Sequence, residues 1–204
     1  MQLEAVNISF RYTKRGKDIL KNVNLAIQEG ERVGLVGPSG YGKSTLAKIL
    51  CGYERPVTGN VLLSGKPLPE RGACPVQLIY QHPEKAINPR WKMQQVLEEA
   101  DQFKDEILDK LGIEREWLKR YPRELSGGEL QRFSIARALS KSTRFLVADE
   151  ISTMLDVITG AQLWNFILEE AQKHNLGLVV ISHNQALVDR VCTRVIDLRE
   201  INQT

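Results

Sequence analysis

The sequence predicts an α/β fold: a mainly parallel sheet, an N-terminal antiparallel β layer and an inserted α-helical segment. After residue 30, short apolar runs alternate with helical patterns, which is typical of parallel strands joined by helices. Before residue 28, two segments of partly alternating polarity are typical of a β-hairpin. From about residue 82 to 125 the chain is charged, helical in pattern and poor in β-branched residues, which indicates the insertion.

The N-terminal elements follow from these patterns. Residues 3–12 and 18–27 are expected to be strands, because apolar side chains partly alternate with polar ones and a polar loop with Gly16 separates them. A buried strand is expected over 32–36, followed by a helix from Lys43 that ends near Gly52. Two further strands are expected at residues 59–65 and 76–80.

In the insertion, two helices are expected to share an apolar face, which consists of Leu97, Phe103, Ile107, Leu108 and Leu111. Pro83, Pro89 and Pro122 bound this segment. The remaining expected elements are an amphipathic helix 128–140, a strand 144–148, a helix 157–174, a strand 177–181, a helix 185–191 and a strand 194–199.

Composition limits the possible functions. The chain has 204 residues, 42% of them hydrophobic, which is enough for one domain or one domain with an inserted lobe. We expect no bilayer-spanning segment, because no apolar run reaches about 18 residues, and no signal peptide at the N-terminus. The 28 basic and 25 acidic residues nearly balance, so bulk charge does not indicate nucleic acid as a partner. Three scattered cysteines suit a reducing compartment and predict neither disulfides nor a metal cluster.

A phosphate-binding loop is predicted between the strand 32–36 and the helix that follows. The stretch matches G-x-x-x-x-G-K-S/T and consists of Gly37, Pro38, Ser39, Gly40, Tyr41, Gly42, Lys43, Ser44 and Thr45. Its glycines allow backbone N–H groups to surround an anion, and the helix adds its positive N-terminal end. Lys43 would reach the β- and γ-phosphates of a nucleotide, and the Ser44 hydroxyl would ligate Mg²⁺. A glycine-rich turn that merely caps a helix is the alternative, and the flanking strand and helix disfavour it.

Polar side chains also follow three other expected strands. They are Gln81, the pair Asp149-Glu150, and His183. If these strands are neighbours, their carboxyl ends converge on one bound triphosphate. Asp149 and the Gln81 amide oxygen would then serve Mg²⁺, and Glu150 would accept a proton from the attacking water or orient it. His183 would donate a hydrogen bond to the γ-phosphate. Without the loop, the two acids would instead be a helix N-cap pair and His183 a structural residue.

A second anion site is predicted where Ser126, Gly127 and Gly128 open a helix. Glu129, three residues after Ser126, also predicts a capping box, and the two interpretations are compatible. A single nucleotide seldom needs two such sites on one chain.

The stretch that contains this site, Leu-Ser-Gly-Gly-Glu-Leu-Gln-Arg (125–132), resembles the signature of the ATP-binding cassette (ABC) family of P-loop NTPases. Other motifs resemble that family in the same order. Residues 37–45 resemble Walker A, Gln81 the Q-loop, 145–150 Walker B with its catalytic glutamate, Asp156 the D-loop acid and His183 the switch histidine. Tyr12 stands where the family places an aromatic ring that stacks on adenine.

The resemblance covers nearly the whole chain and implies one nucleotide-binding domain, residues 1–204. Its core would comprise 1–81 and 141–204, and 82–140 would form a helical subdomain. It also implies a head-to-tail homo- or heterodimer with a second ABC ATPase subunit, in which each ATP lies between Walker A of one subunit and Ser126-Gly127-Gly128 of the other. Two anion sites on one chain would therefore serve two different ATP molecules.

The stretches 81–83 (Gln-His-Pro) and 88–90 (Asn-Pro-Arg) are similar to the Q-loop region of the peptide and nickel importers. That similarity implies transmembrane permease subunits as partners, an extracytoplasmic solute-binding protein acting indirectly, and a place at the cytoplasmic face of the membrane. Peptides and nickel or other metal chelates stay open as solutes. A non-transport ABC ATPase, acting in DNA repair or at the ribosome, is the alternative. Tyr41, Ile151 and the pair Thr153-Met154 depart from the family pattern, but none of them removes a catalytic group.

Overall fold

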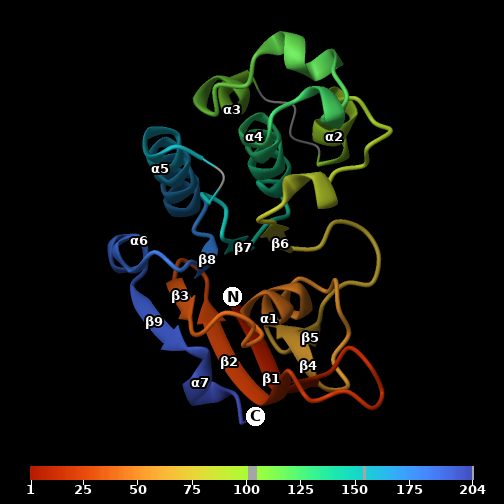
Figure 1. Ribbon diagram of the computed structural model, residues 1–204, viewed down its shortest axis with the longest axis vertical. Helices are drawn as coiled ribbons and strands as arrows, with labels where there is room; N and C mark the ends of the chain where they lie inside the picture. The colour runs from red at the N-terminus through yellow and green to blue at the C-terminus, as the bar shows by residue number, and fades with distance from the viewer. Residues whose placement is uncertain (101–104, 154, 204) are drawn as a thin grey trace.

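The protein is described by a computed structural model that covers residues 1–100, 105–153 and 155–203. Phe103, predicted to line the insertion's apolar face, and Met154, the second departure in the D-loop, lie outside the described residues. Along the long axis the chain forms a helical part, a parallel sheet and an antiparallel sheet (Figure 1). The prediction of an α/β fold with an antiparallel layer and a helical insertion is confirmed.

The antiparallel sheet has the strand order β2-β1-β4-β5. Its strands are β1 (Gln2–Phe10), β2 (Leu20–Gln28), β4 (Thr58–Leu63) and β5 (Lys66–Pro67). β1 and β2 form the predicted hairpin, with Leu3 opposite Ile27. β4, predicted only as a strand, pairs with the other side of β1, and the two-residue β5 was not predicted.

The parallel sheet has the strand order β6-β7-β8-β3-β9. Its strands are β3 (Arg32–Val36), β6 (Val76–Ile79), β7 (Phe145–Asp149), β8 (Gly177–Ile181) and β9 (Arg194–Asp197). The prediction that the last strand reaches residue 199 was wrong. The Asp197 side chain accepts a hydrogen bond from the Arg199 N–H at 2.9 Å and so caps a short helix, α7 (Leu198–Ile201), which ends the strand.

Side chains on the two faces of the parallel sheet belong to two separate cores, because successive residues of a strand point to opposite faces. Val147 and Val179 face α1 (Lys43–Leu50), together with Leu3 and Ile8 of the antiparallel sheet. Helix α1 is therefore enclosed between the two sheets, which holds the loop at its N-terminus in place. Leu146, Ala148, Leu178 and Val180 belong to the second core.

The second core joins the sheet to the helices of the insertion and to α5 (Val157–Lys173). The helices of the insertion are α2 (Met93–Glu99), α3 (Asp105–Lys110) and α4 (Gly127–Ala138). The insertion also contains short 3₁₀ turns, which are η1 (Pro83–Lys85), η2 (Arg115–Lys119) and η3 (Pro122–Glu124). Helix α6 (Gln185–Val191) precedes β9. The described members of the predicted apolar face are all buried: Leu97, Ile107, Leu108 and Leu111. The face was predicted correctly for these four.

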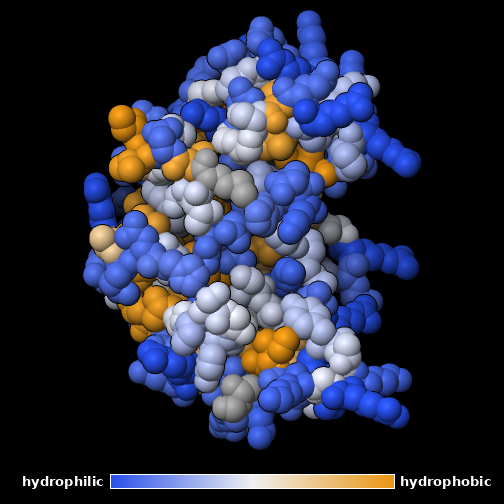
Figure 2. All heavy atoms as spheres, viewed as in Figure 1, coloured by the Kyte–Doolittle hydropathy of each residue, from blue (hydrophilic) through white to orange (hydrophobic). Residues whose placement is uncertain are grey.

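The surface is mixed. On the face shown in Figure 2, hydrophobic side chains form separate small groups between hydrophilic ones. Within the described ranges, no helix combines the length and the hydropathy that crossing a membrane requires.

Candidate active site

The predicted convergence of strand ends is confirmed, because β6, β7, β8 and β3 are consecutive neighbours in the parallel sheet. Asp149 is in register with Ile181, and Leu35 is in register with the same residue from the other side. Since all these strands run in one direction, the residues that follow them lie at one edge. The phosphate-binding loop, Gln81, the acidic pair and His183 therefore share that edge.

In the loop between β3 and α1, the side chain of Lys43 bonds back to the start of the loop. The Lys43 ammonium donates hydrogen bonds to the carbonyl oxygens of Gly37 at 2.8 Å and Pro38 at 2.9 Å, and the side chain is 5% exposed. Gly42 precedes the helix with φ +105°, and a Cβ there would lie 2.9 Å from Leu20 Cδ2. Only glycine fits this backbone, so the cradle is a structural property of the loop.

Tyr12 lies beside the first turn of α1. Its hydroxyl is 3.0 Å from the Thr45 Oγ1, and its ring meets the edge of the Phe10 ring at a centroid distance of 4.9 Å. The residue is nevertheless 56% exposed. An exposed aromatic face is thus held next to the phosphate-binding loop, where a planar base can stack on it.

Asp149 is a buried carboxylate at the end of β7. It is 7% exposed, and its Oδ1 has no hydrogen-bond partner among the described residues. Burial raises the pKa of Asp149 above its ordinary value, and a hydrogen bond from Ser44 partly offsets this. A buried carboxylate oxygen without a partner, next to a serine hydroxyl, fits the oxygen donors that Mg²⁺ prefers.

Glu150 stands between two of the other predicted residues. Its Oε1 lies 2.8 Å from His183 Nε2, and its Oε2 accepts a hydrogen bond from the Gln81 amide at 3.4 Å. The Glu150 side chain is 15% exposed, whereas that of His183 is 53% exposed. The carboxylate is therefore oriented at two points while it stays accessible to water.

The capping box predicted at the start of α4 is present. Ser126 caps α4: its hydroxyl accepts from the Glu129 N–H at 3.3 Å, and the Glu129 carboxylate accepts from the Ser126 N–H at 2.7 Å. Asp156 caps α5 by accepting from the Thr159 N–H at 2.9 Å, and the bonds from Thr159 lower the pKa of Asp156. One open cavity of about 610 Å³ joins the two helix starts.

The residues that line this cavity are Trp117, Ser126, Gly127, Gly128, Glu129, Arg132, Leu155, Asp156 and Thr159. None of them comes from the phosphate-binding loop or from the strand ends that carry Asp149, Glu150 and His183. The two predicted anion sites of the chain thus lie on separate surfaces.

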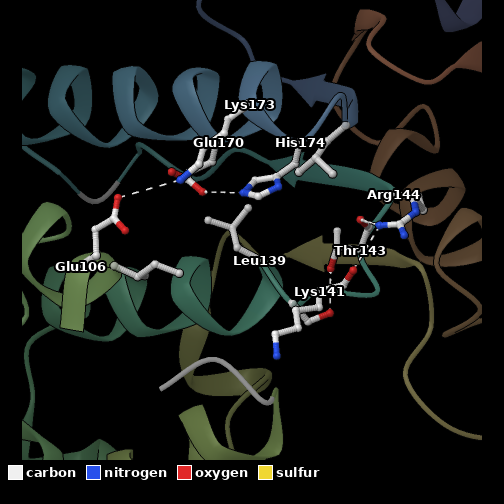
Figure 3. A pocket seen from close by; sticks show the side chains of 11 residues that line it. Glu106, Leu139, Lys141, Thr143, Arg144, Glu170, Lys173 and His174 are labelled. Carbon is white, nitrogen blue, oxygen red and sulfur yellow. Dashed lines mark hydrogen bonds and ion pairs between the residues drawn. The ribbon is translucent and has the colours of Figure 1, made fainter. Parts of the chain in front are cut away.

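A more enclosed cavity of about 330 Å³ lies at the other edge of the sheet, where Thr143-Arg144 and Leu176 precede β7 and β8 (Figure 3). Glu170 of α5 and His174, directly after α5, interact there at 3.4 Å, and Lys173 reaches Glu106 of α3 at 3.9 Å. Lys173 and His174 thus pair with carboxylates of the same cavity and link its two helices, and no glycine is among the described residues that line it.

One residue at the active edge was missed by sequence reasoning. Asp197 ends β9 beside the loop, and a Cβ on Gly37 would lie 3.5 Å from its Oδ1. An acid directly after an apolar strand was the available signal, as it was for Asp149. Because the strand was predicted to reach residue 199, Asp197 was assigned to its interior and not to its end.

Comparison with known proteins agrees with this geometry. A family model described as "ABC transporter" matches residues 20–153, more than half of the chain. The nickel import system ATP-binding protein NikE of Staphylococcus aureus (strain bovine RF122 / ET3-1) is 34% identical over 211 aligned residues, which cover 97% of this chain and 87% of that protein. NikE of the S. aureus strain MRSA252 is 33% identical with the same coverage.

Solved structures show the same fold. A dimeric ATP-binding cassette in a post-hydrolysis state, bound to ADP and Pi, is 25% identical and superimposes with a TM-score of 0.81, covering 96% of this chain and 93% of that one. An ATP-binding subunit of an ABC transporter, 23% identical, reaches 0.82 over 97% of this chain and 85% of its own, a likeness of fold alone. With its family match and its relatives, this chain belongs to the ATP-binding cassette transporter family and is an ATPase of that family.

Proposed function

We propose that this chain is the ATP-hydrolysing subunit of an importer and drives uptake through separate membrane subunits. The observation that carries the catalytic part is the Glu150 carboxylate, held by His183 at 2.8 Å and by Gln81 at 3.4 Å beside the phosphate-binding loop. A fixed, water-accessible carboxylate at this place is suited to take a proton from a water that attacks the γ-phosphate.

The roles of the other residues follow from their positions. Lys43 and the amides of residues 37–45 neutralise the phosphates, and Tyr12 stacks on adenine. Mg²⁺ would be held by Ser44, Asp149 and the Gln81 amide oxygen, and it would withdraw charge from the phosphate oxygens. Water adds to the γ-phosphorus, its proton passes to Glu150, the bond to the β-phosphate oxygen breaks, and ADP and phosphate leave. His183 donates a hydrogen bond to the γ-phosphate.

We further propose that ATP is bound between two cassettes arranged head to tail. The separation of the two anion sites supports this, because the cavity at Ser126 contains no residue of the loop 37–45. Ser126, Gly127, Gly128 and Glu129 would complete the site of the partner cassette, and Asp156 would lie at the contact. A solved relative of this fold is a dimer with ADP and Pi bound. The partner is a second copy or a similar ABC ATPase subunit.

The helical subdomain, residues 82–140, would move against the core, 1–81 and 141–204, when ATP closes the dimer. We place the protein at the cytoplasmic face of the membrane, where transmembrane permeases receive this motion and an extracytoplasmic solute-binding protein acts indirectly. The relatives named as nickel import proteins favour nickel or a nickel chelate over a peptide as the solute.

Glu150→Gln tests the catalytic role. It removes the proton acceptor while keeping the shape of the side chain, so hydrolysis should fall by about 100-fold or more. ATP affinity should stay within about twofold of the original value, and size-exclusion chromatography with ATP should show a trapped dimer. Glu70→Gln, at a side chain that is 87% exposed, is the matched control. Normal turnover in Glu150→Gln would remove Glu150 from the mechanism.

Transport is tested separately in cells. Cells that carry only Glu150→Gln should accumulate less nickel than cells with the original chain, and co-purification from detergent extracts should recover permeases. Equal nickel uptake together with reduced peptide uptake would assign the peptide as the solute. If both uptakes are equal and no permease is recovered, the chain would instead be a non-transport ABC ATPase.

A further inference from the structure

The backbone of Glu150 adopts an unusual conformation. Its φ is +51°, in the left-handed region that residues with side chains rarely occupy. The Glu150 N–H donates to the carbonyl oxygen of Ile181 in β8 at 2.9 Å, so the residue still belongs to the edge of the sheet. This conformation lets the chain turn directly after β7 while the carboxylate reaches Gln81 and His183. Residues in such a conformation persist only where the surroundings hold them.

Thr153 supplies a local restraint on Glu150. Its hydroxyl donates a hydrogen bond to the Glu150 carbonyl oxygen at 3.0 Å, and its backbone N–H donates to the same oxygen at 3.3 Å. The Thr153 side chain is exposed, so it contributes little to either core. Threonine is branched at Cβ and has few rotamers, which keeps the hydroxyl in place.

The turn that contains Thr153 is also anchored on its far side. The indole N–H of Trp164, a buried residue of α5, donates to the Ser152 hydroxyl at 3.4 Å. The Leu155 N–H donates to the Ser152 carbonyl oxygen at 3.2 Å. The segment 150–153 is thus tied to β8 at its start and to α5 near its end, and between these two anchors Thr153 donates both its hydroxyl and its N–H to the Glu150 carbonyl oxygen.

We propose that Thr153 is a positioning residue for ATP hydrolysis, whose hydroxyl holds the Glu150 backbone in the conformation that aims its carboxylate at the attacking water. The proposal rests on the role proposed above for Glu150. Thr153 touches neither nucleotide nor water in this mechanism. Its effect reaches the reaction only through the carbonyl group of Glu150.

Thr153→Val tests the proposal, because valine has the same shape but lacks the hydroxyl. Losing one hydrogen bond that aligns Glu150 should lower kcat for ATP by roughly fivefold to tenfold. The KM for ATP should stay within about twofold, since the phosphate-binding loop is unchanged. Thr153→Ser keeps the hydroxyl and should restore kcat. Thr58→Val, at an exposed threonine of β4, is the matched control for valine on the surface.

A readout independent of turnover uses His183. In Thr153→Val the ¹⁵N resonance of His183 Nε2 should shift, because its contact with Glu150 loosens, and in Thr153→Ser it should stay unchanged. A kcat within twofold of the original in Thr153→Val, with an unmoved His183 resonance, would overturn the positioning role. A loss of kcat in Thr153→Ser equal to that in Thr153→Val would overturn it as well.

Glu150→Gln, assayed on the full chain in parallel, separates the two proposals. If Glu150→Gln is inactive and Thr153→Val is normal, only the positioning role is wrong. If Glu150→Gln hydrolyses ATP normally, the role of Glu150 is wrong and the inference about Thr153 fails with it. In the Glu150→Gln background, Thr153→Val should cause no further loss of turnover.

Discussion

Gly42→Ala should disrupt ATP binding through the backbone, without changing any charge. Gly42 has φ +105°, and a methyl group there would lie 2.9 Å from Leu20 Cδ2, 3.0 Å from Ile19 Cγ2 and 3.2 Å from the Ile19 carbonyl oxygen. The strained backbone costs about 1–3 kcal/mol, and the overpacking adds about 1–3 kcal/mol. The loop of the variant can avoid this energetic cost by adopting another conformation. ATP binding must then restore the conformation that surrounds the phosphates, which weakens the affinity.

Gly40→Ala is the matched control two residues earlier in the same loop. Gly40 has φ +74°, but a Cβ there would meet no atom within 4 Å, so only backbone strain of about 1–2 kcal/mol applies. Since 1.4 kcal/mol is about tenfold in affinity, Gly40→Ala should weaken ATP binding by roughly 5- to 30-fold, and Gly42→Ala, with both costs, by roughly 30-fold or more.

Titration with a fluorescent ATP analogue measures both affinities, and thermal unfolding confirms that both variants fold. A dissociation constant for Gly42→Ala within threefold of the original would refute this reasoning. An equal loss of affinity in the two variants would refute it as well. Such a result would show that contact of position 42 with β2, and with the residue that precedes β2, does not constrain the loop.

Three further predictions concern neighbouring side chains. Lys43→Ala removes a charged donor and should weaken ATP binding by roughly 10- to 100-fold; calorimetric titration that shows unchanged affinity would contradict its assigned role. Asp149→Asn should raise the thermal midpoint at pH 7, because burial raises the pKa of the native carboxyl above that of the unfolded chain. Between these two pKa values, the native state binds more protons than the unfolded state. Asp149 therefore lowers the free energy of unfolding as the pH rises from about 4, near the ordinary pKa of the carboxyl, through the raised native pKa. The stabilisation by asparagine should disappear at pH values below that window, and a gain that is equal at all pH values would exclude the charge as its cause. Tyr12→Phe loses the contact with Thr45 and should weaken ATP binding by about two- to tenfold, whereas Tyr12→Ala should weaken it more; equal affinities in the two variants would show that the ring does not stack.

Much of the fold was predictable because its signals are local. The strands after residue 30 are short apolar runs that end in glycine or polar residues, and the helices between them have a clear period. A predicted element boundary was wrong where a single side chain decides it. Strand β9 stops at Asp197 because that carboxylate caps the next turn. The pairing of β4 with β1 was not predictable, because two strands separated by a long stretch of chain choose their partners through the shared core.

By itself, the sequence determined the helix starts at which the two proposed anion sites lie. Spacing places Lys43 and Ser44 at the start of a helix, and Ser126 with Glu129 at the start of another, because caps and glycine-rich loops depend on adjacent residues. Only the tertiary structure decided which distant side chains meet. Gln81 and Glu150, 69 residues apart, come together because β6 and β7 are neighbours, and His183 joins them through β8. The left-handed backbone of Glu150 and its bonds from Thr153 likewise depend on how β7 ends against β8 and α5, since three-dimensional packing, and not local propensity, holds a residue in that conformation.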